Sequence, residues 1–150
     1  MNYLDTSALI KRFVAEKGSS LVRILVERHG PVATSKLAYA EVYSGLSRKK
    51  REGLLSRAQY TLACRQFEME WSAYIRVDLS DEILFLARDL IQRHPLKGFD
   101  AIHLATALEL KEALGQQIAF AGADERQLQA AALENLTTLN VESAESLPSD

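Results

Sequence analysis

The sequence predicts an α/β protein in which a parallel sheet of short strands is covered by helices on both faces. Short apolar segments of strand length alternate along the chain with longer segments whose apolar residues recur every three or four positions. Short turns marked by glycine or proline join the two kinds of segment. Strands that alternate with helices in this way are typical of a parallel sheet with helices on both sides.

The first half of the chain carries three predicted strands and four predicted helices. Gly18 interrupts the first helical pattern, and Gly30-Pro31 ends the second helix and opens the next strand. Ser56 and Gln59 have the spacing of a capping box, which marks the start of a long helix. The expected strands are 3–4, 32–34 and 75–78, and the expected helices are 7–15, 20–28, a segment around 37–46, and 56–74.

The second half carries two predicted strands and three predicted helices. Ser80 is a natural N-cap for a helix that Pro95 stops. Gly98 lies in the turn before the next helix, which Gly115 ends. The expected helices are 81–93, one from about 100 to 114, and 125–133; the expected strands are 117–121 and 139–141, and the polar end 142–150 is expected to be frayed.

The composition fits one soluble domain over residues 1–150, with 47% hydrophobic residues to build a core. A net charge of -2 argues against a protein that coats nucleic acid through bulk positive charge, so a polyanion must be held locally. The lone Cys64 cannot form an intrachain disulfide. Because the chain shows neither a secretory leader nor an apolar run near the roughly 20 residues of a membrane span, we expect a cytoplasmic protein without membrane association.

Four acidic residues stand where strands give way to helices or early in a helix: Asp5, Glu41, Asp100 and Asp124. The carboxyl ends of parallel strands border one crevice, so these side chains are expected to converge. Carboxylates so close together would repel one another by about 4 kcal/mol per pair at an effective dielectric near 20. Such a cluster makes sense around a divalent cation, which binds oxygen ligands.

Simpler roles remain open for each of these residues. Asp5, Asp100 and Asp124 lie near helix starts, where an aspartate can accept hydrogen bonds from unpaired backbone N–H groups and complement the helix dipole. Glu41 lies in a largely apolar stretch, in which an unpaired carboxylate would be costly unless it faced outward. The prediction of a metal site therefore depends on the set rather than on any one member.

Several other residues are candidates for binding substrate. Lys11 and Arg12 follow Asp5 by one or two helical turns, and Thr6 could place a hydroxyl near a carboxylate or phosphate, although a capping role suits it as well. The basic run 48–51 could follow a nucleic-acid backbone or balance the dipole at a helix end. His103 shares a helix face with Asp100 and could assist substrate binding, but we interpret it as a buried hydrogen-bonding residue.

Four motifs occur in order along nearly the whole chain: YLDTSALIK (3–11), AEVYSGL (40–46), FDAIHLATA (99–107) and FAGADER (120–126). In this combination they resemble the PIN-domain nucleases, and within that family the VapC-type toxins of toxin–antitoxin pairs. The resemblance implies a three-layer α/β/α fold. It also implies an endoribonuclease that uses Mg²⁺ or Mn²⁺ and a metal-activated water to hydrolyse RNA, leaving a 5′-phosphate and a 3′-hydroxyl.

The resemblance further implies a role for each acidic residue and a set of partners. Asp5 and Asp100 would be the primary metal ligands, Glu41 a ligand or a base that orients the water, and Asp124 a direct or water-mediated ligand. The expected partners are the RNA substrate, a cognate antitoxin protein and a second copy of the chain in a homodimer.

The chain departs from the family pattern at Gly122, where many members have threonine or serine two residues before the last aspartate. Glycine offers no hydroxyl to orient a ligand there. This departure and the net negative charge suit an alternative, a noncatalytic PIN domain that binds RNA or protein. A phosphatase-like enzyme with Asp5 as covalent nucleophile fits less well, because Ser7 stands where such enzymes commonly have a second aspartate.

Overall fold

The computed structural model describes residues 1–143 and contains a five-stranded sheet in which every neighbouring pair of strands is parallel. The strand order is β3-β2-β1-β4-β5, so the first strand of the chain is the central one. The strands are β1 (Asn2–Leu4), β2 (Val32–Ser35), β3 (Ile75–Val77), β4 (Ala119–Gly122) and β5 (Thr137–Asn140).

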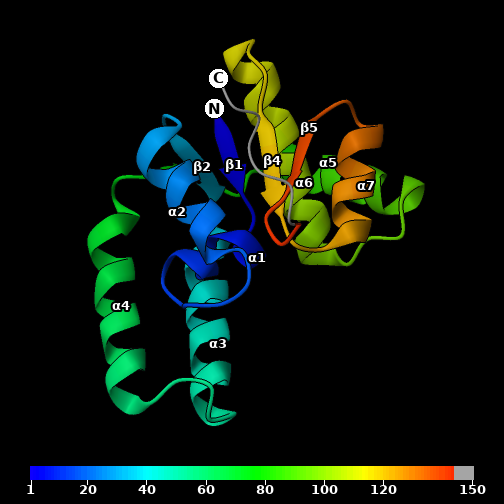
Figure 1. Ribbon diagram of the computed structural model, residues 1–150. Helices are drawn as coiled ribbons and strands as arrows, with labels where there is room; N and C mark the ends of the chain where they lie inside the picture. Colours follow the sequence, from blue (N-terminus) through cyan, green and yellow to red (C-terminus); the bar gives the residue numbers. More distant parts are fainter. Residues whose placement is uncertain (144–150) are drawn as a thin grey trace.

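Helices cover both faces of this sheet, which confirms the predicted three-layer α/β fold (Figure 1). The first four helices pack on one face and the last three on the other. None of the described helices is both long enough and apolar enough to cross a membrane. The helices are α1 (Thr6–Leu9), the 3-10 turn η1 (Ile10–Arg12), α2 (Ser19–Arg28), α3 (Leu37–Arg51), α4 (Arg57–Trp71), α5 (Asp81–Arg93), α6 (Gly98–Leu114) and α7 (Glu125–Leu133).

The central strand β1 is buried on both faces. Tyr3 and Leu4 are fully buried and contribute to different cores, because successive side chains of a strand point to opposite sides of the sheet. Leu4 packs with α1 to α4, whereas Tyr3 stacks on Phe120 of β4 and packs with α5 to α7. A strand that is buried on both faces consists of a short run of apolar residues, and Tyr3-Leu4 is such a run.

The strand order reverses at β1, whose neighbours are β2 on one side and β4 on the other. In open parallel sheets, ligands bind beyond the carboxyl ends of the strands at such a switch point. The segments that follow β1, β2 and β4 lead into α1, α3 and α7. The topology therefore brings the starts of these three helices to one crevice.

Several predicted boundaries differ from the structure: α3 extends to Arg51, α6 already begins at Gly98, which is predicted to lie in the turn before it, and β4 begins at Ala119 rather than at 117. The helix predicted over 7–15 is the short α1 followed by η1, because the N–H groups of Phe13 and Val14 both donate to the C=O of Ile10 and end the helix there. Their apolar side chains are buried all the same, which explains the helical spacing in the sequence. The long helix α4 ends at Trp71, and β5 precedes the predicted 139–141 by two residues.

After β5 the chain packs back against the loop that follows η1. Val141 is buried, and Glu142 forms an ion pair with Lys11 at 2.7 Å. A Cβ on Gly18 would lie 2.5 Å from the Val141 carbonyl oxygen, and the φ of +91° at this position also favours glycine. The rest of the tail that is predicted to be frayed, 144–150, lies outside the described residues.

A hydrogen-bonded ion-pair network ties η1 to α2 and α4. Arg12 donates to Glu70 through Nε and Nη2, each at 3.0 Å, and pairs with Glu27 at 2.7 Å. The Tyr74 hydroxyl donates to the same Glu70 carboxylate at 2.8 Å. Burial disfavours the charge on Glu70, but the bonds from Arg12 and Tyr74 outweigh burial and hold the pKa of this carboxyl below its usual value.

We predict that Glu70→Gln lowers the free energy of unfolding by about 1–3 kcal/mol at pH 7, because Arg12 loses a charged partner in a partly buried setting. Since the folded-state pKa of Glu70 is depressed, its contribution is present above about pH 4.5 and is lost as the pH falls through the folded-state value. Urea unfolding at pH 7 and at pH 3 measures both effects. The exposed Glu112 serves as the control: Glu112→Gln is expected to leave stability unchanged, and an equal effect of the two substitutions would contradict the prediction.

Candidate functional site

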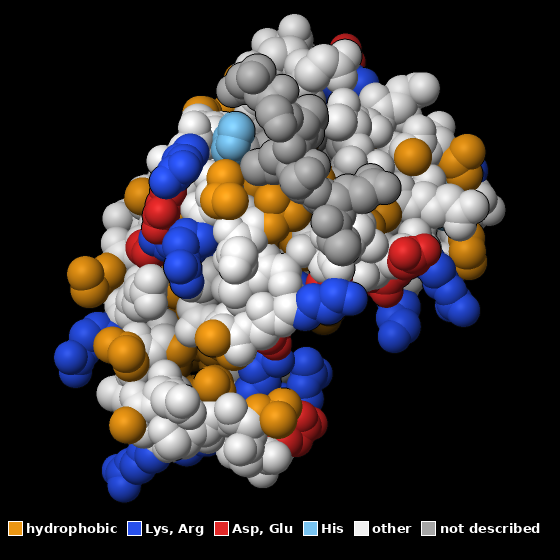
Figure 2. All heavy atoms as spheres, in the orientation of Figure 1, with side chains coloured by type: hydrophobic (Ala, Val, Ile, Leu, Met, Phe, Trp, Pro, Cys, Tyr) orange, Lys and Arg blue, Asp and Glu red, His pale blue; other side chains and the backbone are white. Residues whose placement is uncertain are grey.

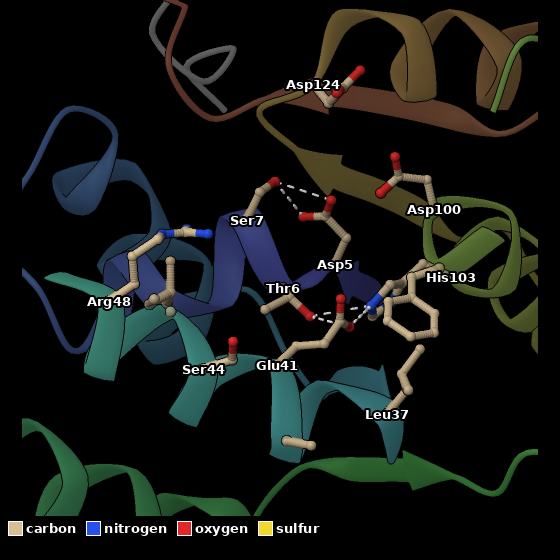
Figure 3. Close-up of a pocket in the computed structure, with 14 residues that line it drawn as sticks. Asp5, Thr6, Ser7, Leu37, Glu41, Ser44, Arg48, Asp100, His103 and Asp124 are labelled. Carbon is tan, nitrogen blue, oxygen red and sulfur yellow. Dashed lines mark hydrogen bonds and ion pairs between the residues drawn. The ribbon is translucent and has the colours of Figure 1, made fainter. Parts of the chain in front are cut away.

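The four predicted carboxylates line one pocket of about 500 Å³ at the carboxyl edge of the sheet. Asp5 follows β1, Glu41 lies in the second turn of α3, Asp100 lies in the first turn of α6, and Asp124 follows β4. Figure 3 shows Asp5 in the middle, with Glu41 on one side and Asp100 and Asp124 on the other. The structure thus brings together residues that are up to 119 positions apart in the sequence.

Asp5 combines a capping role with a place in the pocket. Its side chain is buried, with 3% exposure, and Oδ1 accepts the N–H of Ala8 at 2.9 Å as the N-cap of α1. The Ser7 hydroxyl donates to the same carboxylate, at 2.7 Å to Oδ1 and 3.0 Å to Oδ2. Burial raises the pKa of the Asp5 carboxyl, and the negative charge of Asp100 acts in the same direction.

Gly122 lies directly against Asp5. A Cβ at position 122 would stand 3.3 Å from Cγ and from both oxygens of the Asp5 carboxylate, so a side chain here would crowd the carboxylate. A hydroxyl is nevertheless present at this point, because Ser7 bonds Asp5 and also accepts the N–H of Ala123 at 3.0 Å. Ser7 thereby links the end of β4 to the Asp5 carboxylate.

A chain of hydrogen bonds holds Glu41. Its Oε1 accepts from the Thr6 hydroxyl and from Nε2 of His103, both at 2.7 Å, and Nδ1 of His103 bonds the Tyr3 hydroxyl at 2.8 Å. This arrangement confirms the interpretation of His103 as a buried hydrogen-bonding residue. Burial disfavours the Glu41 charge, but the bonds from His103 and Thr6 outweigh burial and hold the pKa of Glu41 below its usual value.

Asp100 and Asp124 lie across the pocket from Glu41. Asp100 is half-buried, and burial together with the charges of Asp124 and Glu41 raises its pKa. Asp124 is exposed and caps α7 by accepting the N–H of Gln127 at 3.1 Å. The side chain of Gln127 is fully buried and donates through Nε2 to the C=O of Asp100 at 3.2 Å. Gln127 therefore fixes the start of α7 relative to the first turn of α6.

The structure does not bring Lys11 and Arg12 into the pocket. The Lys11 side chain is only 6% exposed and bonds two glutamates, and Arg12 is engaged by the network around Glu70. The positive charge on the pocket wall comes instead from Arg48 of α3, which lies seven residues after Glu41 and on the same helix face. Arg48 belongs to the basic run 48–51, and its spacing from Glu41 could have singled it out within that run.

The donor set suits a hard divalent cation. All four acidic side chains offer oxygen ligands, and burial and mutual repulsion raise the pKa values of Asp5 and Asp100, so a cation would relieve the cost of both charges. Within residues 1–143, no three His, Cys, Asp or Glu side chains stand as a group that could hold an ion alone. Mg²⁺ fits this arrangement, because it usually keeps several waters and takes only one or two carboxylates from the protein.

Comparisons with known sequences find relatives of this chain. The family model of the PIN domain matches residues 3–133. Ribonucleases VapC45 and VapC49 of Mycobacterium tuberculosis are each 37% identical to the chain over 106 residues, which cover 71% of this chain and 74% of theirs.

Solved structures share the fold at lower sequence identity. A toxin–antitoxin complex from Klebsiella pneumoniae aligns with a TM-score of 0.63 and 22% identity, covering 85% of this chain and 90% of that one. VapBC2 from Rickettsia felis, bound to a fragment of promoter DNA, aligns with a TM-score of 0.63 and 16% identity, covering 93% of this chain and 98% of that one.

We predict that Gly122→Ala lowers the free energy of unfolding by about 1 kcal/mol or more, because the new methyl group crowds a carboxylate that Ser7 and Ala8 already hold in place. Urea denaturation measures the effect. Gly98→Ala is the matched control, since a Cβ there meets no atom within 4 Å, and it is expected to be neutral or slightly stabilising. If both variants were as stable as the parent, the contact with Asp5 would not be a constraint.

Proposed function

The chain belongs to the PIN domain family, and from this premise we propose that it is a metal-dependent endoribonuclease, the toxin of a toxin–antitoxin pair. The observation that carries the proposal is the convergence of Asp5, Glu41, Asp100 and Asp124 on one pocket. The Mycobacterium relatives are ribonucleases by name, which supports RNA as the substrate. The reaction is hydrolysis of a phosphodiester bond by water.

Asp5 and Asp100 are proposed to hold Mg²⁺ or Mn²⁺, with Asp124 as a direct or water-mediated ligand. Such an ion polarises phosphoryl oxygens and makes a water molecule more acidic. Asp5 is suited to this role because Ser7 and the Ala8 N–H fix its orientation, so little conformational freedom is lost when a ligand binds. The phosphate of the substrate would supply further oxygen ligands.

Glu41 is proposed as the base. Its Oε1 is occupied by Thr6 and His103, and in the described part of the chain no hydrogen bond engages Oε2, which can take the proton of the attacking water. The lowered pKa keeps this carboxyl ionised at neutral pH. Arg48, on the same wall, offers a positive charge to the substrate phosphate.

The proposed protein partners are an antitoxin and a second copy of the chain. Toxin–antitoxin complexes among the solved structures with this fold support the first. The α4 helix offers a surface for such a partner, because Leu62 and Met69 project from its outer side with 62% and 74% exposure. The homodimer stays a prediction from family resemblance.

We predict that Asp5→Asn and Asp100→Asn each lower the rate of RNA cleavage by about a hundredfold or more, because a ligand of the charge-stabilising ion is lost. The assay incubates pooled transfer and ribosomal RNA with the purified protein and Mg²⁺ or Mn²⁺, and a chelator should abolish cleavage as well. Asp89→Asn, in a partly exposed residue of α5 that pairs only with Arg88 among the described residues, is the control and should cleave like the parent. Full activity in both pocket variants, with folding intact, would refute the assignment.

We also predict that millimolar Mg²⁺ or Mn²⁺ raises the melting temperature of the parent protein and shifts it little in an Asp5→Asn/Asp100→Asn double variant, because binding to the folded state stabilises it by mass action. Differential scanning fluorimetry and titration calorimetry measure the two effects. An unchanged melting temperature and no heat of cation binding, together with tight binding to a protein or RNA partner, would favour the noncatalytic PIN domain instead.

A further inference from the structure

A large aromatic side chain stands exposed at the mouth of the pocket. Phe99 is the second residue of α6 and the immediate neighbour of Asp100, and it lines the same pocket as the four carboxylates. Its side chain is 58% exposed and belongs to neither hydrophobic core. The pocket therefore has an exposed aromatic side chain beside the carboxylates.

A second hollow of about 380 Å³ adjoins the pocket on the side of α7. Asp100 and Asp124 line both hollows, and the charged residues Lys97, Glu125 and Arg126 line the second one. Neither Lys97 nor Arg126 forms an ion pair with any residue of 1–143, although acidic side chains lie near both. Figure 2 shows basic side chains, with acidic ones among them, along the concave edge between the lobe with α3 and α4 and the lobe with α6 and α7.

These features match the parts of a single nucleotide. A base stacks on an aromatic ring whatever its identity, and a phosphate takes cationic partners. Stacking on a protein ring requires a base with a free face, and the bases inside a duplex have none. A protein partner would match the exposed ring but gives no reason for two cations at the same rim that form no direct ion pair within residues 1–143.

Resting on the proposed ribonuclease activity, we propose that Phe99, Lys97 and Arg126 form a subsite for one unpaired nucleotide of the RNA, next to the phosphate that is cleaved. The base stacks on Phe99, and the phosphate of that nucleotide lies in the second hollow between Lys97 and Arg126. The subsite positions the strand across Asp100 and selects unpaired RNA over duplex.

The test uses single-stranded RNA octamers that carry 2-aminopurine at one position in turn, mixed with the full-length protein and Ca²⁺ in place of Mg²⁺. Stacking quenches 2-aminopurine fluorescence, so the parent protein should quench the probe at one position of the strand. The same octamer annealed to its complement should not be quenched further. Phe99→Tyr keeps the ring and should behave like the parent, whereas Phe99→Leu should lose the quenching and bind about tenfold more weakly.

The salt dependence of the RNA affinity tests whether Lys97 and Arg126 contact phosphates. Lys97→Gln and Arg126→Gln should each lower the slope of log affinity against log salt concentration by about 0.7, the value for one phosphate contact on a single strand. Arg57→Gln, in an exposed basic residue of α4 that lines a different hollow, is the matched control and should leave the slope unchanged. All of these side chains are exposed, so the melting temperatures should stay at the parent value.

Parental binding and quenching in Phe99→Leu would overturn the subsite, as would unchanged salt slopes in both cation variants. A Phe99→Leu protein that binds RNA normally but changes its mass by light scattering would identify Phe99 as a protein contact, and would equally overturn it. Either result leaves cleavage by the parent protein intact. If the parent neither cleaved nor bound RNA, the proposed function would fail and the subsite with it.

Discussion

The position of one buried carboxylate organises the whole pocket. Asp5 ends the central strand, and its side chain must accept hydrogen bonds because an unpaired buried charge would be costly. Ser7 and the Ala8 N–H satisfy it, and α1 begins at this point as a result. Because Gly122 has no side chain, β4 passes close beside the carboxylate. This one contact therefore helps to position β1 and β4 and the acidic residues that follow them, Asp5 and Asp124.

The pocket contains two electrostatic environments. Burial and like charge raise the pKa values of Asp5 and Asp100, whereas donors from His103 and Thr6 lower the pKa of Glu41. Carboxyls whose pKa values are pushed apart in one site are suited to different tasks. The difference originates in the fold: His103 reaches Glu41 from α6, and its other nitrogen bonds Tyr3, which lies on the opposite face of β1 from the α3 core. The division between ion ligands and base in our proposal follows this difference.

Much of this arrangement could be predicted from the sequence, because the relevant signals are local. Asp5 and Asp124 directly follow apolar strand segments and Asp100 opens a helix, so a parallel sheet brings them to one edge whatever the details of packing. The placement of Lys11 and Arg12 could not be predicted in the same way. Their partners Glu142 and Glu70 lie 131 and 58 residues away, and the turn η1 redirects the helix that the periodicity predicts. The close approach of Gly122 to Asp5 and the bond from the Ala123 N–H to Ser7 are likewise contacts between distant segments, visible only in three dimensions.

Asp100 and Asp124 form a shared wall between the two hollows, and this has a thermodynamic consequence. A cation on one side of that wall neutralises charge that would otherwise repel an anion on the other side, so the two ligands stabilise each other through the same pair of oxygen donors. Linkage requires the effect to be reciprocal: whatever factor the cation adds to the affinity for the anion, the anion adds to the affinity for the cation. A low cation affinity of the isolated protein is therefore compatible with tight cation binding once the anion is also bound.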